Sequence, residues 1–362
     1  VLERVLTAAA VARLDADRLD PEALAAVDEF HMRGRSATEE LLHSMELDPA
    51  MRIVDVGCGL GGAARHVAAG VGCRVTGLDL REPDASERHH GVSYEMGDVR
   101  DPALGKLLEQ CEVDTVVHLA AVVTPGPASS RALEYAIDVE GTRNVAEACV
   151  QAGVQQLVYT SSGAAYGYHA SNPVPLRESD PLRGNEIFAY AWHKRLAEEA
   201  LAEQRSAHPE LAQLVFRVGT ILGERVASPI TALFERSVIV GVAGSDAPFV
   251  LIWDEDVAAC ITKGILERRS GIYNLAGDGA LPLREIARRL GKPYLPVPAP
   301  LLAGALGLLR MTGLSSRGAE QVDFLRYRPV LANDALKREF GFTPRFTSAE
   351  CFEHYRQLRF GA

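Results

Sequence analysis

Apolar positions along the chain alternate between short strand-like runs and longer segments with helical spacing. The strand-like runs are rich in β-branched residues and lie at 53–56, 74–78, 115–119, 156–160 and 214–218. Helical patterns lie between them, for example around 132–152 and 190–203. Since this alternation is typical of parallel strands joined by helical crossovers, it predicts an α/β fold with a doubly wound parallel Rossmann sheet. Such sheets bind ligands beyond the carboxyl ends of their strands.

The same pattern divides the chain into three parts. Residues 1–49 have helical spacing and are expected to form an N-terminal helical cap, and residues 50–222 form the predicted Rossmann cofactor-binding domain. The alternation then becomes irregular, so we interpret residues 223–362 as mainly a smaller substrate-binding lobe. The most apolar stretch, Leu295 to Leu309, is shorter than the roughly 20 residues that a membrane helix needs. We expect it to be a buried or lid helix.

Composition narrows the class of protein. The chain has 362 residues, 47% of them hydrophobic, which is enough for a large core. A net charge of −10 and the absence of a long basic run argue against a nucleic-acid partner. The six cysteines lie far apart without CxxC pairs, and no targeting segment is evident, so we expect reduced thiols in a soluble, cytoplasmic protein without a membrane partner. His89 and His90 lack metal-ligand spacing, and no metal site is predicted.

A glycine-rich motif follows the first predicted strand. Residues 57–62 fit GxGxxG through Gly57, Gly59 and Gly62, and they also fit the pattern GxGxG. Glycine lets the backbone turn tightly and approach an anionic ligand at the N-terminus of the following helix. Asp79 ends the next strand about 20 residues later, where a carboxylate can accept hydrogen bonds from an adenosine ribose. The carboxylate favours NAD over NADP, whereas S-adenosylmethionine (SAM), with the same ribose, remains an alternative.

A second motif places Tyr190 and Lys194 four residues apart on a predicted helix, after the strand end Thr160-Ser161-Ser162. Residues at this spacing share a helix face, so the ammonium group is expected to lower the pKa of the phenol from about 10 toward the working pH. A serine on the neighbouring strand end would hydrogen-bond the same substrate oxygen during hydride transfer. A surface Tyr–Lys pair is the alternative for an isolated YxxxK motif.

The surroundings of this motif resemble the active-site region of extended, epimerase-like short-chain dehydrogenases. Residues 159–167, Tyr-Thr-Ser-Ser-Gly-Ala-Ala-Tyr-Gly, carry the likeness together with Tyr190 and Lys194, and Ser162 matches the family's catalytic serine. The likeness covers about residues 92–355. It implies an NAD(P)-dependent oxidoreductase or epimerase that acts on a small-molecule substrate. It also implies a homodimer formed through the two helices predicted above.

Further segments extend this resemblance to the cofactor. His118-Leu119-Ala120-Ala121 is similar to the family's strand-four cofactor motif, and Gly97-Asp98-Val99 is similar to the segment that contacts adenine. The resemblance therefore implies cofactor contacts by Asp98, Val99, Leu119, Ala120 and Ala121. Asp138 departs from the pattern, because the family usually has Asn there. We expect a changed proton relay and local charge, or a structural role for this residue.

The segment from about 30 to 80 instead resembles a class I SAM-dependent methyltransferase. Residues 55–62 are similar to that family's motif I, and the dehydrogenase pattern GxxGxxG is absent. This likeness implies a chimera, natural or engineered, with a seam near residues 81–92. Beside the oxidoreductase or epimerase, it leaves open a SAM-binding protein or methyltransferase. It also leaves open a weakly active chimera, because misplacing a dinucleotide by about 1 Å can cost on the order of a hundredfold in rate.

Overall fold

The computed structural model describes most of the chain beyond the first predicted strand. The described residues are 52–56, 74–80, 92–123, 129–224, 226, 228–312 and 318–361. The predicted N-terminal cap and the glycine motif with Gly57, Gly59 and Gly62 lie outside them.

A seven-stranded parallel sheet forms the centre of the molecule, which confirms the predicted doubly wound Rossmann fold. Its order is β11-β6-β5-β4-β1-β2-β3. The strands are β1 (Arg52–Val56), β2 (Arg74–Asp79), β3 (Val92–Met96), β4 (Thr115–His118), β5 (Gln156–Ser162), β6 (Ala212–Val218) and β11 (Gly271–Leu275). The chain builds outward from β1 to β3 and then crosses to β4 on the other side of β1, so the order reverses between β1 and β4. Ligands bind at such a reversal, beyond the carboxyl ends of the strands.

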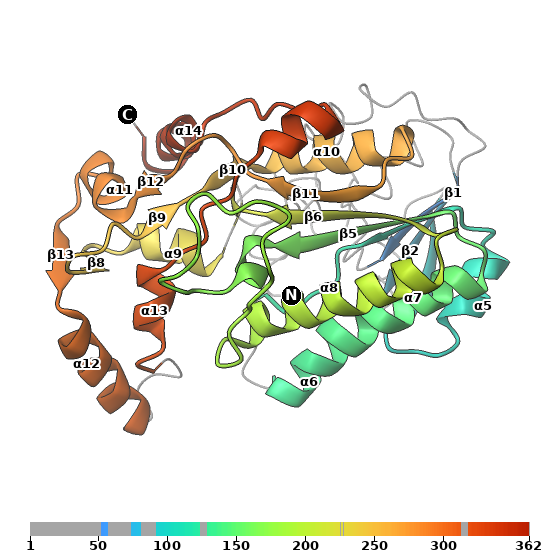
Figure 1. Ribbon diagram of the computed structural model, residues 1–362, viewed down its shortest axis with the longest axis horizontal. Coiled ribbons are helices and arrows are strands. Elements are labelled where there is room, and N and C mark those ends of the chain that lie inside the picture. The colour runs from blue at the N-terminus through green and yellow to red at the C-terminus, as the bar shows by residue number, and fades with distance from the viewer. Residues whose placement is uncertain are drawn as a thin grey trace, which may run out of the picture.

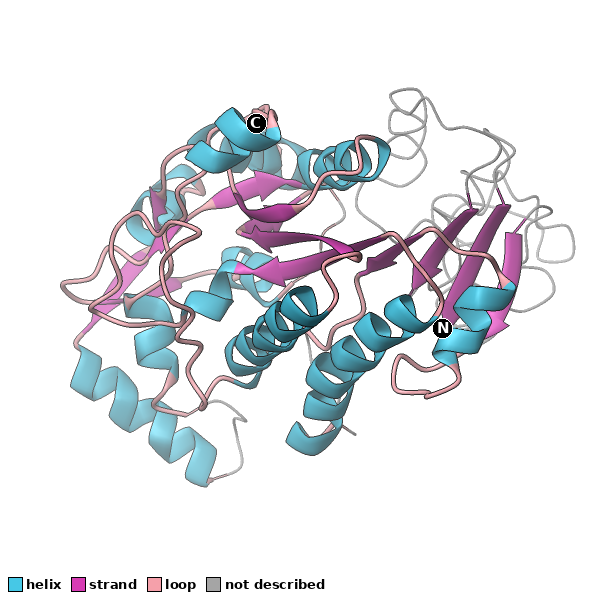
Figure 2. Cartoon of the chain, turned by 45° about the vertical axis from the view of Figure 1, so that its right-hand side comes forward, coloured by secondary structure: helices cyan, strands magenta, loops and turns pink. Residues whose placement is uncertain are grey.

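Helices cover both faces of this sheet (Figure 1). One face carries α5 (Leu104–Gln110), α6 (Arg131–Tyr135), α7 (Gly141–Gln151) and α8 (Ala189–Ala207), and the other carries α10 (Asp254–Leu266). The helix predicted around 132–152 is in fact three consecutive segments, because a π-helical turn, η1 (Ala136–Glu140), joins α6 to α7. Figure 2 shows the strands crossing the molecule between the helical layers.

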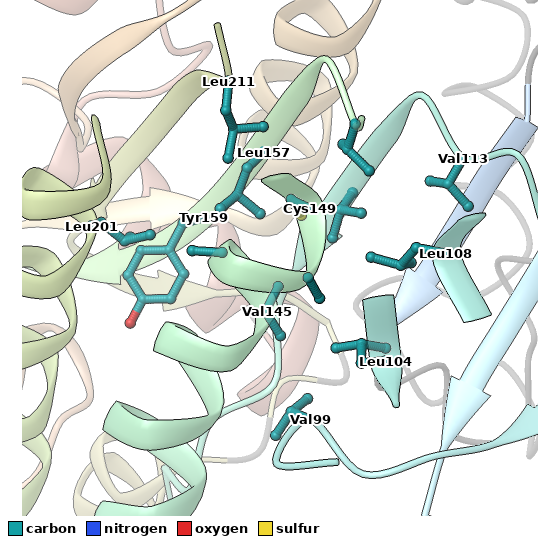
Figure 3. Packing of buried hydrophobic residues seen from close by; sticks show 14 of the residues in the cluster. Val99, Leu104, Leu108, Val113, Val145, Cys149, Leu157, Tyr159, Leu201 and Leu211 are labelled. Carbon is teal, nitrogen blue, oxygen red and sulfur yellow. The ribbon is translucent and has the colours of Figure 1, made fainter. Parts of the chain in front are cut away.

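A buried apolar cluster joins the sheet to α5, α7 and α8 (Figure 3). Leu157 of β5 packs there with Val145 and Cys149 of α7 and Leu201 of α8. Burying each such aliphatic side chain contributes roughly 1.5–3 kcal/mol. Tyr159 belongs to the same cluster, with its hydroxyl oxygen at the margin (Figure 3). The core therefore fixes β5 and α8, the two elements that carry the predicted catalytic residues.

The remaining residues form a smaller lobe of three two-stranded sheets and short helices. Its strands are β7 (Thr220–Leu222), β8 (Ile239–Val242), β9 (Pro248–Phe249), β10 (Leu251–Trp253), β12 (Leu281–Pro282) and β13 (Tyr294–Val297). Its helices are α9 (Pro229–Glu235), α11 (Leu283–Arg289), α12 (Ala299–Met311), α13 (Gln321–Arg326) and α14 (Ser348–Phe360). The π-helical η3 (Leu336–Phe340) packs instead against β11 of the main sheet. Phe234, Phe249 and Phe352 are buried in its centre. Since β11 and α10 return to the main sheet, residues after Leu222 build both the lobe and one sheet edge.

The apolar stretch from Leu295 to Leu309 is not buried, so that part of its prediction is wrong. It forms the end of β13 and most of α12, and Leu301 and Leu308 are 67% and 63% exposed. The helix packs against α13, and residues along the rest of it are exposed among the described part of the chain. Among the residues that the structure describes, no helix has the length and apolar character needed to cross a membrane.

Candidate active site

The predicted catalytic residues lie at the carboxyl edge of the main sheet. Val56 of β1 pairs with both Leu78 and His118, and His118 in turn pairs with Tyr159 of β5. The ends of β2, β1, β4 and β5 are therefore side by side. Ser162 is the last residue of β5, one strand away from the point where the strand order reverses.

Ser162 and Tyr190 meet at this edge. The Ser162 hydroxyl accepts a hydrogen bond from the backbone N–H of Ala164, 3.1 Å away, and so caps the short 3-10 helix η2 (Gly163–Tyr166). Tyr190 lies in the first turn of α8, and its phenol is near the Ser162 side chain. Tyr190 packs against a buried cluster of Ala164, Tyr168 and Ala191, which Phe188, Phe324 and Tyr327 also contact. The structure thus brings together two hydroxyl groups that can face one substrate oxygen.

The pKa of Tyr190 does not move in the predicted direction. Burial raises it to about 12, and the nearby Ser162 side chain offsets this only in part. The ammonium nitrogen of Lys194 lies 5.9 Å from the centre of the Tyr190 ring. The prediction of a pKa lowered toward neutrality is therefore wrong for this structure, because loss of solvent disfavours the phenolate more than its neighbours favour it.

Lys194 is almost fully buried and donates two hydrogen bonds to β5. Its Nζ atom lies 3.1 Å from the Tyr159 hydroxyl and 2.7 Å from the Thr160 carbonyl oxygen. Burial lowers the pKa of Lys194 to about 8, against the opposing charges of Asp138 and Glu198. At neutral pH the ammonium form still predominates, so a positive charge sits beneath the Ser162 and Tyr190 pair.

From Tyr159 a buried polar chain continues to β4. The Tyr159 hydroxyl is near the side chain of Thr142, whose Oγ1 lies 2.9 Å from Nε2 of His118. Thr142 donates its own proton to the Asp138 carbonyl oxygen at 2.7 Å, so Nε2 of His118 is the donor in their contact. Burial lowers the pKa of His118 to about 3, which keeps the imidazole neutral. No role was predicted from the sequence for Tyr159 or Thr142, although Tyr159 opens the segment 159–167 that carries the resemblance.

Asp138 is buried, and its carboxylate contacts two separate elements. Oδ1 accepts a hydrogen bond from the backbone N–H of Val122, 2.8 Å away. Oδ2 lies 3.0 Å from Nδ1 of His193. The sequence singled out Asp138 as a departure, but it missed His193, which stands directly before Lys194 in the second motif.

The carboxyl edge around β2 and β3 has groups that fit the adenosine half of a dinucleotide. Asp79 ends β2 and pairs in register with Met96 at the end of β3. Leu80, Met96 and Leu119 are 61%, 65% and 44% exposed at this edge. A carboxylate beside exposed apolar side chains offers an acceptor for ribose hydroxyls and a surface for a flat base. The Asp79 carboxylate and these apolar side chains therefore fit the adenosine half of a nicotinamide dinucleotide.

The other predicted cofactor residues have different surroundings. Asp98 accepts hydrogen bonds from the backbone and side chain of Arg100, which holds the pKa of its carboxyl below the usual value. Val99 is buried against Gly141, where an added Cβ would lie 2.6 Å from its Cγ2 atom. Its side chain thus packs in the core. Ala120 and Ala121 are partly buried beside Leu119.

Comparison with known proteins identifies the family. A profile of the NAD dependent epimerase/dehydratase family matches residues 59–262, which are 204 of the 362 residues. The chain belongs to this family. It is 26% identical over 291 residues to "Uncharacterized protein Rv0501" of Mycobacterium tuberculosis, covering 78% of this chain and 76% of that one. It is also 38% identical over 154 residues to the N-acetyl-alpha-D-glucosaminyl-diphospho-ditrans,octacis-undecaprenol 4-epimerase of Escherichia coli O157:H7, covering 42% and 44% of the two chains.

Solved structures agree on the fold. The crystal structure of the Bordetella bronchiseptica enzyme WbmG in complex with NAD and UDP has a TM-score of 0.63 to this chain. The alignment covers 86% of this chain and 96% of WbmG at 20% sequence identity. This likeness establishes a Rossmann architecture shared with NAD-binding members of the family.

The family match also bears on the segment that resembles a methyltransferase. The match begins at Gly59, inside that segment, and spans the expected seam at 81–92. In the structure β1 and β2 belong to one sheet with β4 to β6. The findings therefore give no support to a methyltransferase, a SAM site or a chimera.

Proposed function

We propose that the protein is an NAD-dependent oxidoreductase or epimerase that moves a hydride at a carbinol or carbonyl carbon of its substrate and a proton at the attached oxygen. The observation that carries this proposal is the meeting of the Ser162 and Tyr190 side chains at the carboxyl edge of the sheet, with the Lys194 ammonium below them. Two hydroxyls beside one cation suit the transfer of a single proton.

In this proposal Tyr190 is the proton-transfer group and Ser162 orients the substrate oxygen. For reduction, the phenol gives its proton to the carbonyl oxygen while a hydride reaches the carbonyl carbon. For oxidation, the phenolate takes the proton of the substrate hydroxyl while the C–H bond of the carbinol carbon breaks and its hydride leaves. Burial raises the pKa of Tyr190, so this residue holds the proton it would donate. The cofactor, when bound, supplies the hydride or accepts it, and its oxidised ring carries a positive charge that favours the phenolate.

The substrate class that we propose is a sugar linked to a diphosphate. The Escherichia coli relative is by name a 4-epimerase of such a compound, and WbmG was solved with UDP. Arg328 offers a cation for the anionic part. Its guanidinium carbon lies 3.9 Å from the centre of the Phe249 ring and 4.8 Å from that of Phe324, which packs against the same buried cluster as Tyr190. Within the described residues, its buried Nη1 atom has no hydrogen-bond partner.

Asp79 leads us to propose NAD rather than NADP as the cofactor. Two like charges about 4 Å apart cost on the order of 4 kcal/mol at an effective dielectric constant near 20, before relaxation and screening by salt. Even after a large discount, repulsion of the 2′-phosphate favours NAD by roughly tenfold or more.

Calorimetric titration with NADH, NADPH and SAM tests the cofactor and the function together. We expect the wild type to bind NADH most tightly and Asp79→Ala to narrow the gap to NADPH. Glu109→Ala, on the exposed surface of α5, is the charge-matched control. Tighter binding of NADPH by the wild type would refute the role of Asp79. Binding of SAM without binding of NADH would refute the oxidoreductase.

A further inference from the structure

One buried carboxylate connects the predicted cofactor segment to the helix of the active site. Asp138 lies in η1 with 3% exposure, and His193 lies in α8 with 1% exposure. The Asp138 carboxylate accepts from the N–H of Val122 through Oδ1 and contacts His193 through Oδ2. Val122 directly follows Leu119-Ala120-Ala121, and His193 precedes Lys194 on its helix.

The side chain at position 138 decides which ring nitrogen of His193 carries the proton. The backbone N–H of Val122 can only donate, so Oδ1 is an acceptor. A carboxylate oxygen also accepts, so Oδ2 accepts a hydrogen bond from Nδ1 of His193. An asparagine offers one acceptor oxygen and turns an N–H toward the second partner. The Tyr135 ring packs edge-on against His193, with centroids 5.7 Å apart, which holds the imidazole in this orientation.

The carboxylate also contributes charge to the site. Every element that packs around Asp138 and His193 carries ionisable groups. They are Tyr190, Lys194 and Glu198 of α8, Tyr159 of β5, His118 of β4, Arg217 of β6, Arg131 and Tyr135 of α6, Glu140 of η1, and Glu186. Glu198 is compensated by Arg217, whose Nε and Nη2 lie 2.9 and 2.8 Å from its Oε2 atom. The charge of Asp138 opposes the effect of burial on the pKa of Lys194.

We propose that Asp138 and His193 form a positioning pair that fixes α8 against the segment 119–122 and supplies negative charge to the buried Lys194 and Tyr190 site. This inference rests on the proposed function, because it assigns the pair a role in that same site. Neither residue is placed against the substrate. Asp138 acts through the negative charge that it places near Lys194. His193 acts by holding α8 in its orientation.

The pH profile of turnover separates charge from mere packing. Asp138→Asn keeps the size of the side chain but removes its charge, so Lys194 loses its proton at lower pH. We expect the alkaline limb of the kcat profile to move down by about half to one pH unit. Glu199→Gln is the matched control, because it neutralises an exposed carboxylate on α8 that pairs with Arg195. We expect no shift in that variant.

A second measurement needs neither cofactor nor turnover. Histidine nitrogen NMR on the protein labelled at histidine reports which ring nitrogen carries the proton, and the His193 signal is assigned by its loss in His193→Asn. We expect Nδ1–H in the wild type and Nε2–H in Asp138→Asn, because the new amide then donates to Nδ1. His193→Asn keeps a donor near the position of Nδ1 and is expected to keep the wild-type alkaline limb. His193→Phe removes the donor and is expected to lower kcat by about tenfold or more.

These outcomes separate the inference from the proposed function. An unchanged alkaline limb together with an unchanged His193 tautomer in Asp138→Asn overturns the positioning pair. If the wild type shows no NAD-dependent turnover, the proposed function fails, while the tautomer still decides whether the pair exists. If Asp138→Asn does not fold, equal kcat in His193→Asn and His193→Phe overturns the inference.

Discussion

Lys194 donates a hydrogen bond to the hydroxyl of Tyr159, with 3.1 Å between Nζ and the phenol oxygen. The same ammonium lies 5.9 Å from the centre of the Tyr190 ring. Lys194 is therefore anchored to β5, with its ammonium group near the Tyr190 ring. On the side away from Tyr190, Lys194 contacts Tyr159, which is near the buried Thr142 and His118.

Tyr190→Phe tests the proton-transfer group. The variant keeps the ring and its packing but loses the proton, so we expect NAD-dependent turnover to fall by at least about a hundredfold with nearly unchanged cofactor affinity. Steady-state rates and calorimetry measure the two effects. Tyr273→Phe is the control, because that hydroxyl donates to the Ser270 carbonyl away from the site. Turnover retained in Tyr190→Phe would contradict the mechanism.

Lys194→Met tests the charge buried below the site. The folded-state pKa of Lys194 is about 8, against 10.5 for the free side chain. Between these values the unfolded state binds a proton that the folded state lacks, so this residue makes the wild type more stable as pH rises. We expect the free energy of unfolding of the wild type, relative to the variant, to increase by up to about 3 kcal/mol from pH 8 to 10.5. Urea unfolding measures this difference, with Lys106→Met on the exposed side of α5 as control. A difference that stays flat across the window would show that the ammonium is not desolvated.

His118→Gln tests the neutral imidazole at the end of the polar chain. The folded-state pKa of His118 is about 3, against 6.5 for the free side chain. Below pH 6.5 the unfolded state takes up a proton that the folded state does not, so the wild type loses stability as pH falls. The glutamine amide can still donate to Thr142. Relative to this variant, we expect the wild type to lose about 2 kcal/mol between pH 6.5 and 5 in urea unfolding. Equal acid sensitivity of the two proteins would argue against a buried neutral His118, and His208→Gln at the exposed pair with Glu210 is the control.

Sedimentation tests the proposed homodimer. The interface that we propose consists of the helices from α6 to α7 together with α8, as the family resemblance implies. Ala132 is exposed on α6, so an arginine there fits the single chain but would break a dimer packed on this face. We expect a dimer at micromolar concentration for the wild type and a monomer for Ala132→Arg, with Ala103→Arg as control. A monomeric wild type would rule out this interface.

The sequence alone predicted the parts of the protein that depend on short-range pattern. Apolar runs of strand length placed five strands of the main sheet, and the helical spacing of Tyr190 and Lys194 placed both residues on α8. Residues four apart on a helix share a face whatever packs against them. The sequence also predicted that Asp79 and Ser162 lie at the same edge of the sheet. Each residue ends a strand, and parallel strands have their carboxyl ends at one edge.

Tertiary structure decided the partners and the charges. Lys194 and Tyr159 are 35 residues apart, and Asp138 and His193 are 55 residues apart, so only the packing of α8 and η1 against β4 and β5 brings them together. Burial likewise reversed the expected direction for the pKa of Tyr190, because desolvation depends on every element around the ring. The exposure of the apolar α12 also depends on the folded chain. Hydrophobicity can be read from the sequence, but which elements cover a helix depends on the tertiary structure.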